Sequence, residues 1–214
     1  RAAGASMVQV SAIGADTASP SRYARSKSRG EAAVLEVLPD AVILRPSIIF
    51  GPEDDFFNRF ANMARYSPFL PLMGGGHTRF QPVYVADVAE AVARAVDGKV
   101  SGGRIYELGG PEVMTFRQCM ERMLQIIDRK RALVPLPWFV ARIMGKVLGL
   151  LPKPLLTADQ VLLMQSDNVV SEQAVREGRS FDAFDIAPKA PGAILPSYLW
   201  TFRKAGQYAR PVQG

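Results

Sequence analysis

The sequence has few of the side chains that form disulfides and metal sites. Its 214 residues include one cysteine, Cys119, and one histidine, His77. A lone cysteine cannot form a disulfide within the chain, which is typical of proteins from a reducing compartment. We interpret the acidic run Glu53-Asp54-Asp55 as the first turn of a helix, where the helix dipole favours negative charge. Because these carboxylates lack convergent further ligands, we expect no metal site.

Long apolar runs and blocks of one charge are also absent. Without a run of about 18 apolar residues, we expect no membrane-spanning helix. Basic residues outnumber acidic ones, 26 to 20, but they are scattered among the acids and form no recognisable nucleic-acid-binding module. We therefore expect no nucleic-acid partner. An apolar content of 48% with 21% charged residues is typical of a folded globular protein.

A tyrosine and a lysine four residues apart are the most informative feature of the sequence. Tyr23 and Lys27 lie in a stretch that we expect to begin a helix near Ser21, so both side chains share one helix face. A neighbouring ammonium group favours the phenolate and is expected to lower the pKa of Tyr23. Such a tyrosine can act as a general acid or base on a carbonyl or an alcohol.

The order of the flanking elements predicts an α/β fold. A short strand over residues 7–11 is followed by a loop of small and polar residues up to Pro20. The helix then continues until Pro39 stops it. Residues 41–46 include an apolar run without alternation, which is typical of a strand buried on both faces. The turn after Pro46 lies at the carboxyl end of this strand, where open α/β sheets bind ligands.

This order of strand, serine, Tyr-x-x-x-Lys helix, buried strand and Arg-Pro turn resembles the extended short-chain dehydrogenase/reductase superfamily, which includes NAD-dependent epimerases and dehydratases. The resemblance implies the carboxyl part of a Rossmann-like, doubly wound parallel sheet with a small, mostly helical substrate-side domain. It also implies a catalytic triad of Ser11, Tyr23 and Lys27. The residues expected to contact NADP or NAD are Tyr23, Lys27, Pro46, Ser47, Ile48 and Ile49.

The resemblance also assigns a role to Arg79. Extended reductases often carry a substrate-binding arginine a few residues before a helix that corresponds here to about residues 86–96. The alternative is a solvated charge on a surface hairpin, because exposed arginines are common. Asp87 is expected either to cap that helix or to lie in its first turn.

Four segments narrow the resemblance to one branch. Residues 21–23, 46–54, 57–60 and 81–88 are similar to the atypical branch that contains the NDUFA-nine-like accessory subunits of respiratory complex I. We therefore expect an NAD(P)-binding protein that resembles these accessory subunits and is linked to a respiratory complex or to ubiquinone metabolism. The alternative is an active NAD(P)-dependent oxidoreductase or epimerase that uses the triad on an unknown carbonyl or alcohol.

One feature of the superfamily is missing from the sequence. Neither G-x-G-x-x-G nor G-x-x-G-x-x-G occurs, although such a turn holds the pyrophosphate of a dinucleotide. The run Gly74-Gly75-Gly76 is not flanked by a strand and a helix, so we interpret it as a hairpin or loop. We expect that the chain is the carboxyl part of a longer protein without its amino-terminal third. By itself it is then expected to bind NAD(P) poorly and to be inactive.

We expect a domain boundary near residue 110. Residues 1–110 are assigned to the carboxyl part of the NAD(P)-binding domain, with a substrate-side excursion over about residues 53–80. Residues 111–214 are assigned to a small, mainly helical domain that binds substrate or a partner. The helices predicted in this part begin near Thr115, Thr157, Ser171 and Pro196.

A further helix, over residues 137–151, is unusually apolar and has Arg142 and Lys146 as its charged pair. Such a helix can be buried in the core, dock on a partner or lie on a membrane surface. We expect part of its apolar face, around Trp138 and Phe139, to stay exposed and to form a docking surface. The expected location is the cytoplasm of a bacterium, with peripheral attachment to the inner membrane as an alternative.

Overall fold

Three parallel strands form the main sheet. The computed structural model describes residues 6–150, 156–204 and 206. The strands, in sheet order, are β1 (Val8–Val10), β2 (Val42–Pro46) and β7 (Ile105–Leu108). The central strand, β2, pairs in parallel with both neighbours. Its adjacent side chains Ile43 and Leu44 point to opposite faces and are both fully buried, as the unbroken apolar run predicts.

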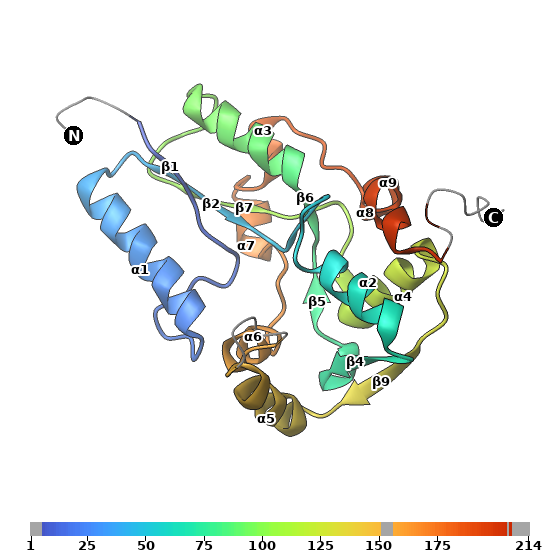
Figure 1. The fold of residues 1–214 in the computed structure, drawn as a ribbon. Helices are drawn as coiled ribbons and strands as arrows, with labels where there is room; N and C mark the ends of the chain where they lie inside the picture. Colours follow the sequence, from blue (N-terminus) through green and yellow to red (C-terminus); the bar gives the residue numbers. More distant parts are fainter. Residues whose placement is uncertain (1–5, 151–155, 205, 207–214) are drawn as a thin grey trace.

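Helices α1 (Arg22–Val37) and α3 (Val85–Val96) cover the two faces of this sheet (Figure 1). On the α1 side, buried Glu31 accepts hydrogen bonds of 2.9 and 2.6 Å from the guanidinium of Arg45 on β2. On the α3 side, Leu44 belongs to one apolar cluster with the inward residues of that helix. The predicted Rossmann-like α/β sheet with helices on both faces is therefore confirmed.

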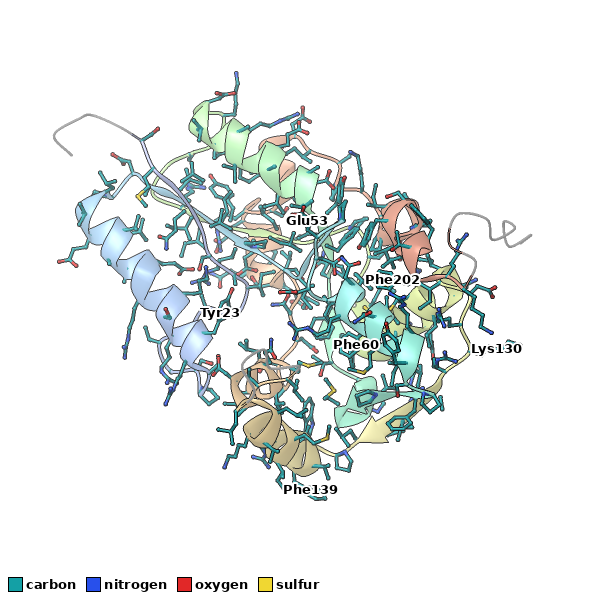
Figure 2. The ribbon with its side chains drawn as sticks, viewed as in Figure 1. Tyr23, Glu53, Phe60, Lys130, Phe139 and Phe202 are labelled. Carbon is teal, nitrogen blue, oxygen red and sulfur yellow. The ribbon has the colours of Figure 1, made fainter. Side chains whose placement is uncertain are left out.

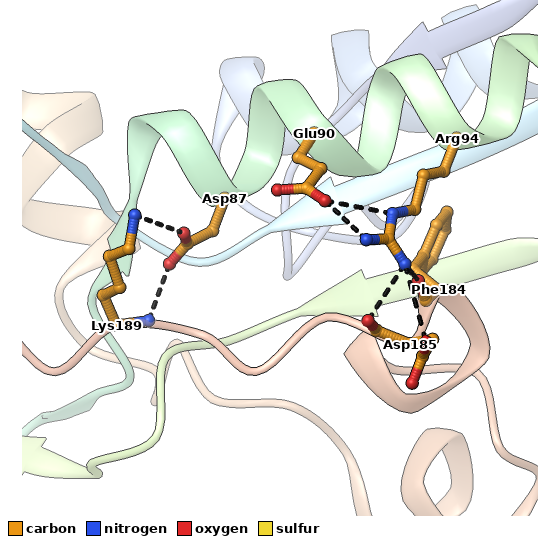
Figure 3. A network of polar contacts seen from close by, with 6 residues as sticks. All are labelled: Asp87, Glu90, Arg94, Phe184, Asp185 and Lys189. Carbon is orange, nitrogen blue, oxygen red and sulfur yellow. Dashed lines mark hydrogen bonds and ion pairs between the residues drawn. The ribbon is translucent and has the colours of Figure 1, made fainter.

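A segment near the carboxyl end of the chain holds α3 in place through polar contacts (Figure 3). Asp87 lies in the first turn of α3, and its carboxylate accepts a 2.7 Å hydrogen bond from the backbone N–H of Lys189. In the last turn of α3, the guanidinium of Arg94 donates to the backbone carbonyls of Phe184 and Asp185. The expectation that Asp87 lies in the first turn is confirmed, but its carboxylate does not cap α3, because it bonds this distant segment instead.

The other elements form the substrate side of the molecule and short connections. A two-stranded parallel sheet pairs β4 with β9, and smaller ladders pair β3 with β6 in parallel and β5 with β8 in antiparallel orientation. The strands are β3 (Ile49–Phe50), β4 (Phe69–Met73), β5 (Arg79–Phe80), β6 (Val83–Tyr84), β8 (Met114–Thr115) and β9 (Ala132–Leu136). The longer helices are α2 (Phe57–Tyr66), α4 (Phe116–Ile126), α5 (Trp138–Leu148) and α6 (Ala158–Leu163). The short ones are α7 (Glu172–Arg176), α8 (Pro191–Ile194), α9 (Pro196–Leu199) and the 3-10 turns η1 (Gly74–Gly76), η2 (Phe181–Phe184) and η3 (Trp200–Phe202).

In the part of the chain that the structure describes, two apolar clusters make up the core. One lies between the main sheet and α3, and the other lies among α2, β4, α4 and the carboxyl-terminal helices. The second cluster is rich in aromatic contacts, with the rings of Phe60 and Phe116 5.3 Å apart. Each cluster draws residues from both sides of residue 110, and the domain boundary at that position stays a prediction.

Most predicted helices are present, with two corrections. The expected hairpin or loop over Gly74–Gly76 is a 3-10 turn, in which Gly74 has a positive φ of 57°. The helix expected from Pro196 to Tyr208 does begin at Pro196 but is shorter than predicted. It ends after one turn as α9, and its end is marked by the hydroxyl of Thr201, which donates to the backbone carbonyl of Tyr198. Side chains that bond nearby carbonyls compete with the backbone ladder of a helix. Residues 205, 207 and 208 of that expected helix lie outside the described residues.

The apolar side chains of helix α5 are only partly exposed in the way that the sequence predicts. Phe139, Ile143 and Val147 form an exposed stripe on its outer face. Trp138 was expected to be exposed as well, but it is half-buried and its ring packs directly over Gly74. Only glycine fits there, because an added Cβ would lie 2.1 Å from the tryptophan ring. Of the helices that the structure describes, none combines the length and apolar character needed to cross a bilayer.

Candidate functional site

A cavity of about 860 Å³ opens at the carboxyl ends of β1 and β2. Its size falls within the range of small-molecule and cofactor sites. Eight site residues were predicted from the sequence, and six of them line this cavity: Ser11, Tyr23, Pro46, Ser47, Ile48 and Ile49. Lys27 and Arg79 do not line it. Figure 2 shows Tyr23 on the side of α1 that faces α2, the helix that carries Phe60.

Ser11 is placed to bind a ligand in the cavity. It follows β1 directly, and its backbone N–H donates a 2.7 Å hydrogen bond to the carbonyl of Leu44, which continues the parallel ladder. Only 4% of Ser11 is exposed, and its Oγ has no hydrogen-bond partner among the described residues. Buried hydroxyl groups normally have partners, so an unpaired one beside a cavity indicates a place for a ligand oxygen.

Tyr23 and Lys27 lie on one face of α1, as their spacing predicts. The Lys27 Nζ lies 5.6 Å from the centre of the Tyr23 ring and 3.5 Å from the backbone carbonyl of Val10. The predicted lowering of the tyrosine pKa is wrong for this geometry, because partial burial raises the pKa of Tyr23 above its ordinary value. Nearly half of the residue, 46%, is nevertheless exposed, so Tyr23 is accessible to a bound molecule.

The position of Tyr23 depends on a carboxylate from the far end of the chain. Asp159 of α6 accepts hydrogen bonds from the hydroxyl of Ser21 at 2.9 Å and from the backbone N–H groups of Arg22 and Tyr23 at 2.7 and 3.1 Å. Desolvation by burial acts to raise the pKa of Asp159, but these three hydrogen bonds outweigh it and lower the pKa. A carboxylate at a helix amino terminus satisfies free N–H groups and is favoured by the helix dipole.

A second distant residue, Asn168, holds together three loops around the cavity. Its side-chain Oδ1 accepts a 3.0 Å hydrogen bond from the backbone N–H of Ile48, and its Nδ2 donates to the carbonyl of Ile13 at 3.3 Å. The hydroxyl of Ser47 lies 2.7 Å from the same Oδ1 and 2.8 Å from the backbone carbonyl of Asn168. The backbone N–H of Asn168 donates to the carbonyl of Arg79 at 2.8 Å. Sequence analysis missed Asn168 and Asp159, because neither lies in a recognisable motif.

Arg79 is engaged in an ion pair at the edge of the site. Its guanidinium and its backbone N–H bond the carboxylate of Asp167 at 2.8 and 2.7 Å. Asp167 lines the cavity, whereas Arg79 does not. The hydrogen bond from the Arg79 backbone is the main cause that lowers the pKa of Asp167. A direct contact between Arg79 and a substrate therefore stays a prediction.

The substrate-side wall of the cavity is largely apolar. It is built from α2, β4, β9, α5 and α6, whose side chains include Phe60, Phe69, Val134, Met144 and Leu163. Ser11 and Tyr23 line the same cavity. The cavity thus joins a polar end, which can bind an oxygen and exchange a proton, to an extended apolar surface.

Comparison with known proteins is consistent with this geometry. The family described as RmlD substrate binding domain matches residues 13–135. The chain belongs to this family. The NADH dehydrogenase [ubiquinone] 1 alpha subcomplex subunit 9 of Arabidopsis thaliana is 39% identical over 209 residues, which cover 93% of this chain and 51% of that protein. The same subunit of Mus musculus is 38% identical over 156 residues, or 72% of this chain and 41% of that protein.

The family's fold also appears in solved structures. The chain superimposes on dTDP-glucose 4,6-dehydratase from Bacillus anthracis str. Ames, in complex with NAD, with a TM-score of 0.62 and 16% identity. The match covers 94% of this chain and 63% of that one. The expected membership of the extended short-chain dehydrogenase/reductase superfamily, in the branch of the complex I accessory subunits, is confirmed. The chain spans about half the length of the curated relatives that it matches.

Proposed function

We propose that the protein carrying this chain binds NADP or NAD and acts as an accessory subunit of respiratory complex I or of a related assembly. The observation that carries this proposal is the single cavity shared by Ser11, Tyr23 and residues 46–49 at the carboxyl ends of parallel strands. Open α/β sheets bind their ligands at this edge. The names of the plant and mouse relatives support the link to an NADH dehydrogenase complex.

The residues around the cavity fit the nicotinamide end of a dinucleotide. Ile48 and Ile49 offer an apolar wall for the ring, and the Ser47 hydroxyl is held away from it by Asn168. Lys27 does not line the cavity, but its ammonium group lies beside the Tyr23 ring and would bond ribose hydroxyl groups there, while the unpaired Ser11 hydroxyl is left for a substrate oxygen. When bound, the nicotinamide supplies the acceptor or donor of a hydride.

Titration with NADPH and NADH, followed by nicotinamide fluorescence, tests the binding. Lys27→Met should weaken binding by about tenfold to a hundredfold, because a hydrogen bond from a charged group contributes about 1.5–3 kcal/mol. Lys99→Met, on the exposed loop after α3, is the matched control and should bind like the wild type. Equal affinities for all three proteins would place the dinucleotide elsewhere.

A second candidate is an active oxidoreductase, which is favoured by the presence of Ser11 and Tyr23 at one end of the cavity. In the oxidation of an alcohol, the bound nicotinamide would supply the hydride acceptor, and the phenolate oxygen of Tyr23 would take the proton of the substrate hydroxyl. Ser11 would hold the substrate oxygen. Tyr23→Phe would then retain dinucleotide binding and lose turnover, whereas an accessory subunit without turnover would show no activity in either form.

The exposed stripe of α5 supports attachment to a larger assembly. Phe139, Ile143 and Val147 face solvent, with the cations Arg142 and Lys146 beside them. We infer that this stripe docks on a partner subunit or on the surface of the membrane that holds the respiratory complex. Phe139→Ser should reduce either association and leave dinucleotide binding unchanged. Sedimentation with vesicles that contain phosphatidylglycerol separates the two cases, because only membrane docking gives binding to lipid alone.

A further inference from the structure

We propose that the cavity binds a long-chain alcohol or ketone, with its oxygen at Ser11 and Tyr23 and its hydrocarbon chain along the apolar wall. The proposal rests on the proposed function, since it concerns the substrate side of the same cavity. It departs from a sugar-nucleotide substrate, which would require many hydrogen-bonding groups on that wall.

The apolar wall is accessible rather than collapsed. Phe69 on β4 and Val134 on β9 line the cavity and are 52% and 43% exposed. Met144 of α5 also lines it and is half-buried. Exposed apolar surface of this extent usually marks a binding site, because contact between such surface and water is unfavourable.

Two polar groups on this wall, Ser67 and Gln160, are already engaged within the chain. The Ser67 hydroxyl donates to the carbonyl of Phe69 at 2.6 Å. The side-chain carbonyl of Gln160 accepts from the backbone N–H of Thr157 in a capping box. Asp55 and Arg59 form an ion pair of 3.9 Å, and the Asp55 side chain is almost completely exposed. Ser67 and Gln160 therefore offer little to the hydroxyl groups of a sugar along the wall, and a hydroxyl buried without a partner is costly.

The polar end of the cavity fixes the orientation of such a ligand. The Ser11 hydroxyl is more than nine-tenths buried and has no partner among the described residues, although it lines the cavity. It can donate to one ligand oxygen, and Tyr23 lines the same cavity. A ligand with a single oxygen and a hydrocarbon chain could bond Ser11 through its oxygen and contact the apolar wall with its chain.

A series of methyl ketones from 2-hexanone to 2-dodecanone tests the proposal by isothermal titration calorimetry. The protein carrying this chain is used with and without NADPH. Each methylene buried along the wall should tighten binding about fourfold, because its transfer from water contributes about 0.8 kcal/mol. UDP-glucose is the polar comparison. Affinity that does not depend on chain length, or tighter binding of UDP-glucose than of 2-dodecanone, would overturn the proposal.

Two variants locate the hydrocarbon chain. Met144→Gln keeps the side-chain length and should weaken the binding of 2-dodecanone about fivefold or more, with little effect on 2-hexanone. Val134→Thr is nearly isosteric, which guards against loss of the fold, and should have a smaller effect in the same direction. Val96→Thr, at the exposed end of α3 and outside the cavity, is the matched control and should change neither affinity. Equal effects of Val134→Thr and Val96→Thr would exclude this wall as the chain site.

A Ser11→Ala variant tests the polar end. It should weaken all ketones by the same factor, about fivefold, because one hydrogen bond of about 1 kcal/mol is lost whatever the chain length. An unchanged affinity of Ser11→Ala would refute the assigned orientation. The NADPH titration separates the two proposals. Binding of NADPH without chain-length-dependent ketone binding defeats only this inference, whereas the opposite result defeats only the dinucleotide proposal.

Discussion

Removing the charge of Asp159 should loosen the amino terminus of α1, which carries Tyr23. The carboxylate bonds the Ser21 hydroxyl and two backbone N–H groups of that first turn, across more than a hundred residues of sequence. Loss of a helix cap costs about 0.5–2 kcal/mol. Asp159 is half-buried and solvent weakens the charge contribution, so we expect Asp159→Asn to lower the free energy of unfolding by about 1 kcal/mol at pH 7.

The pH dependence of this effect follows from the pKa of the carboxylate. In the folded protein the pKa of Asp159 is lowered, so the unfolded chain binds the proton more tightly. The stabilisation is therefore fully present above the ordinary aspartate pKa near 3.9 and is lost as the pH falls through the lower folded value. The difference between wild type and Asp159→Asn should shrink toward zero over that acidic range.

Urea unfolding of both proteins, followed by circular dichroism between pH 7 and pH 3, measures this difference. Asp55→Asn removes an exposed carboxylate and serves as the control, with an expected change within about 0.5 kcal/mol. Parallel pH profiles for wild type and Asp159→Asn would refute the reasoning. So would an Asp159→Asn variant as stable as the wild type at pH 7.

Three further predictions concern the fold around the site. Glu31→Gln should lower the free energy of unfolding by about 3 kcal/mol in urea titrations, because it leaves Arg45 with an uncompensated, largely buried charge. Gly74→Ala should lower it by about 2 kcal/mol and shift the fluorescence of Trp138, since the new methyl group collides with that ring at a positive φ. Cys119 should not react with Ellman's reagent at pH 8 until urea unfolds the protein, because burial raises the pKa of its thiol to about 12.

Local patterns predicted much of the fold and part of the site. Ser21 does begin α1, and Thr115 does begin α4 with a capping box, because such caps depend on residues within one turn. The apolar run of β2 and the shared face of Tyr23 and Lys27 are likewise properties of neighbouring residues. These features place the main sheet and one edge of the cavity.

The parts of the site that could not be predicted depend on contacts between residues far apart in the sequence. Asp159 and Asn168 reach the site from segments more than a hundred residues away, and their partners are mostly backbone groups, which have no sequence pattern. The pairing of Arg79 with Asp167 likewise joins two residues that lie far apart in the sequence. The pKa of Tyr23 follows from its burial, which helical spacing alone does not determine.

Isoleucine methyl NMR tests whether the dinucleotide binds in the cavity beside Ile48 and Ile49. The protein carrying this chain, labelled with ¹³C at its isoleucine methyl groups, is titrated with NADPH. NADPH should cause large shifts of the Ile48 and Ile49 methyl signals, because both residues line the cavity beside the expected nicotinamide ring. Ile43, inside the sheet, and Ile143, on the outer face of α5, should stay nearly unchanged. Saturable NADPH binding that leaves Ile48 and Ile49 unshifted would contradict the account.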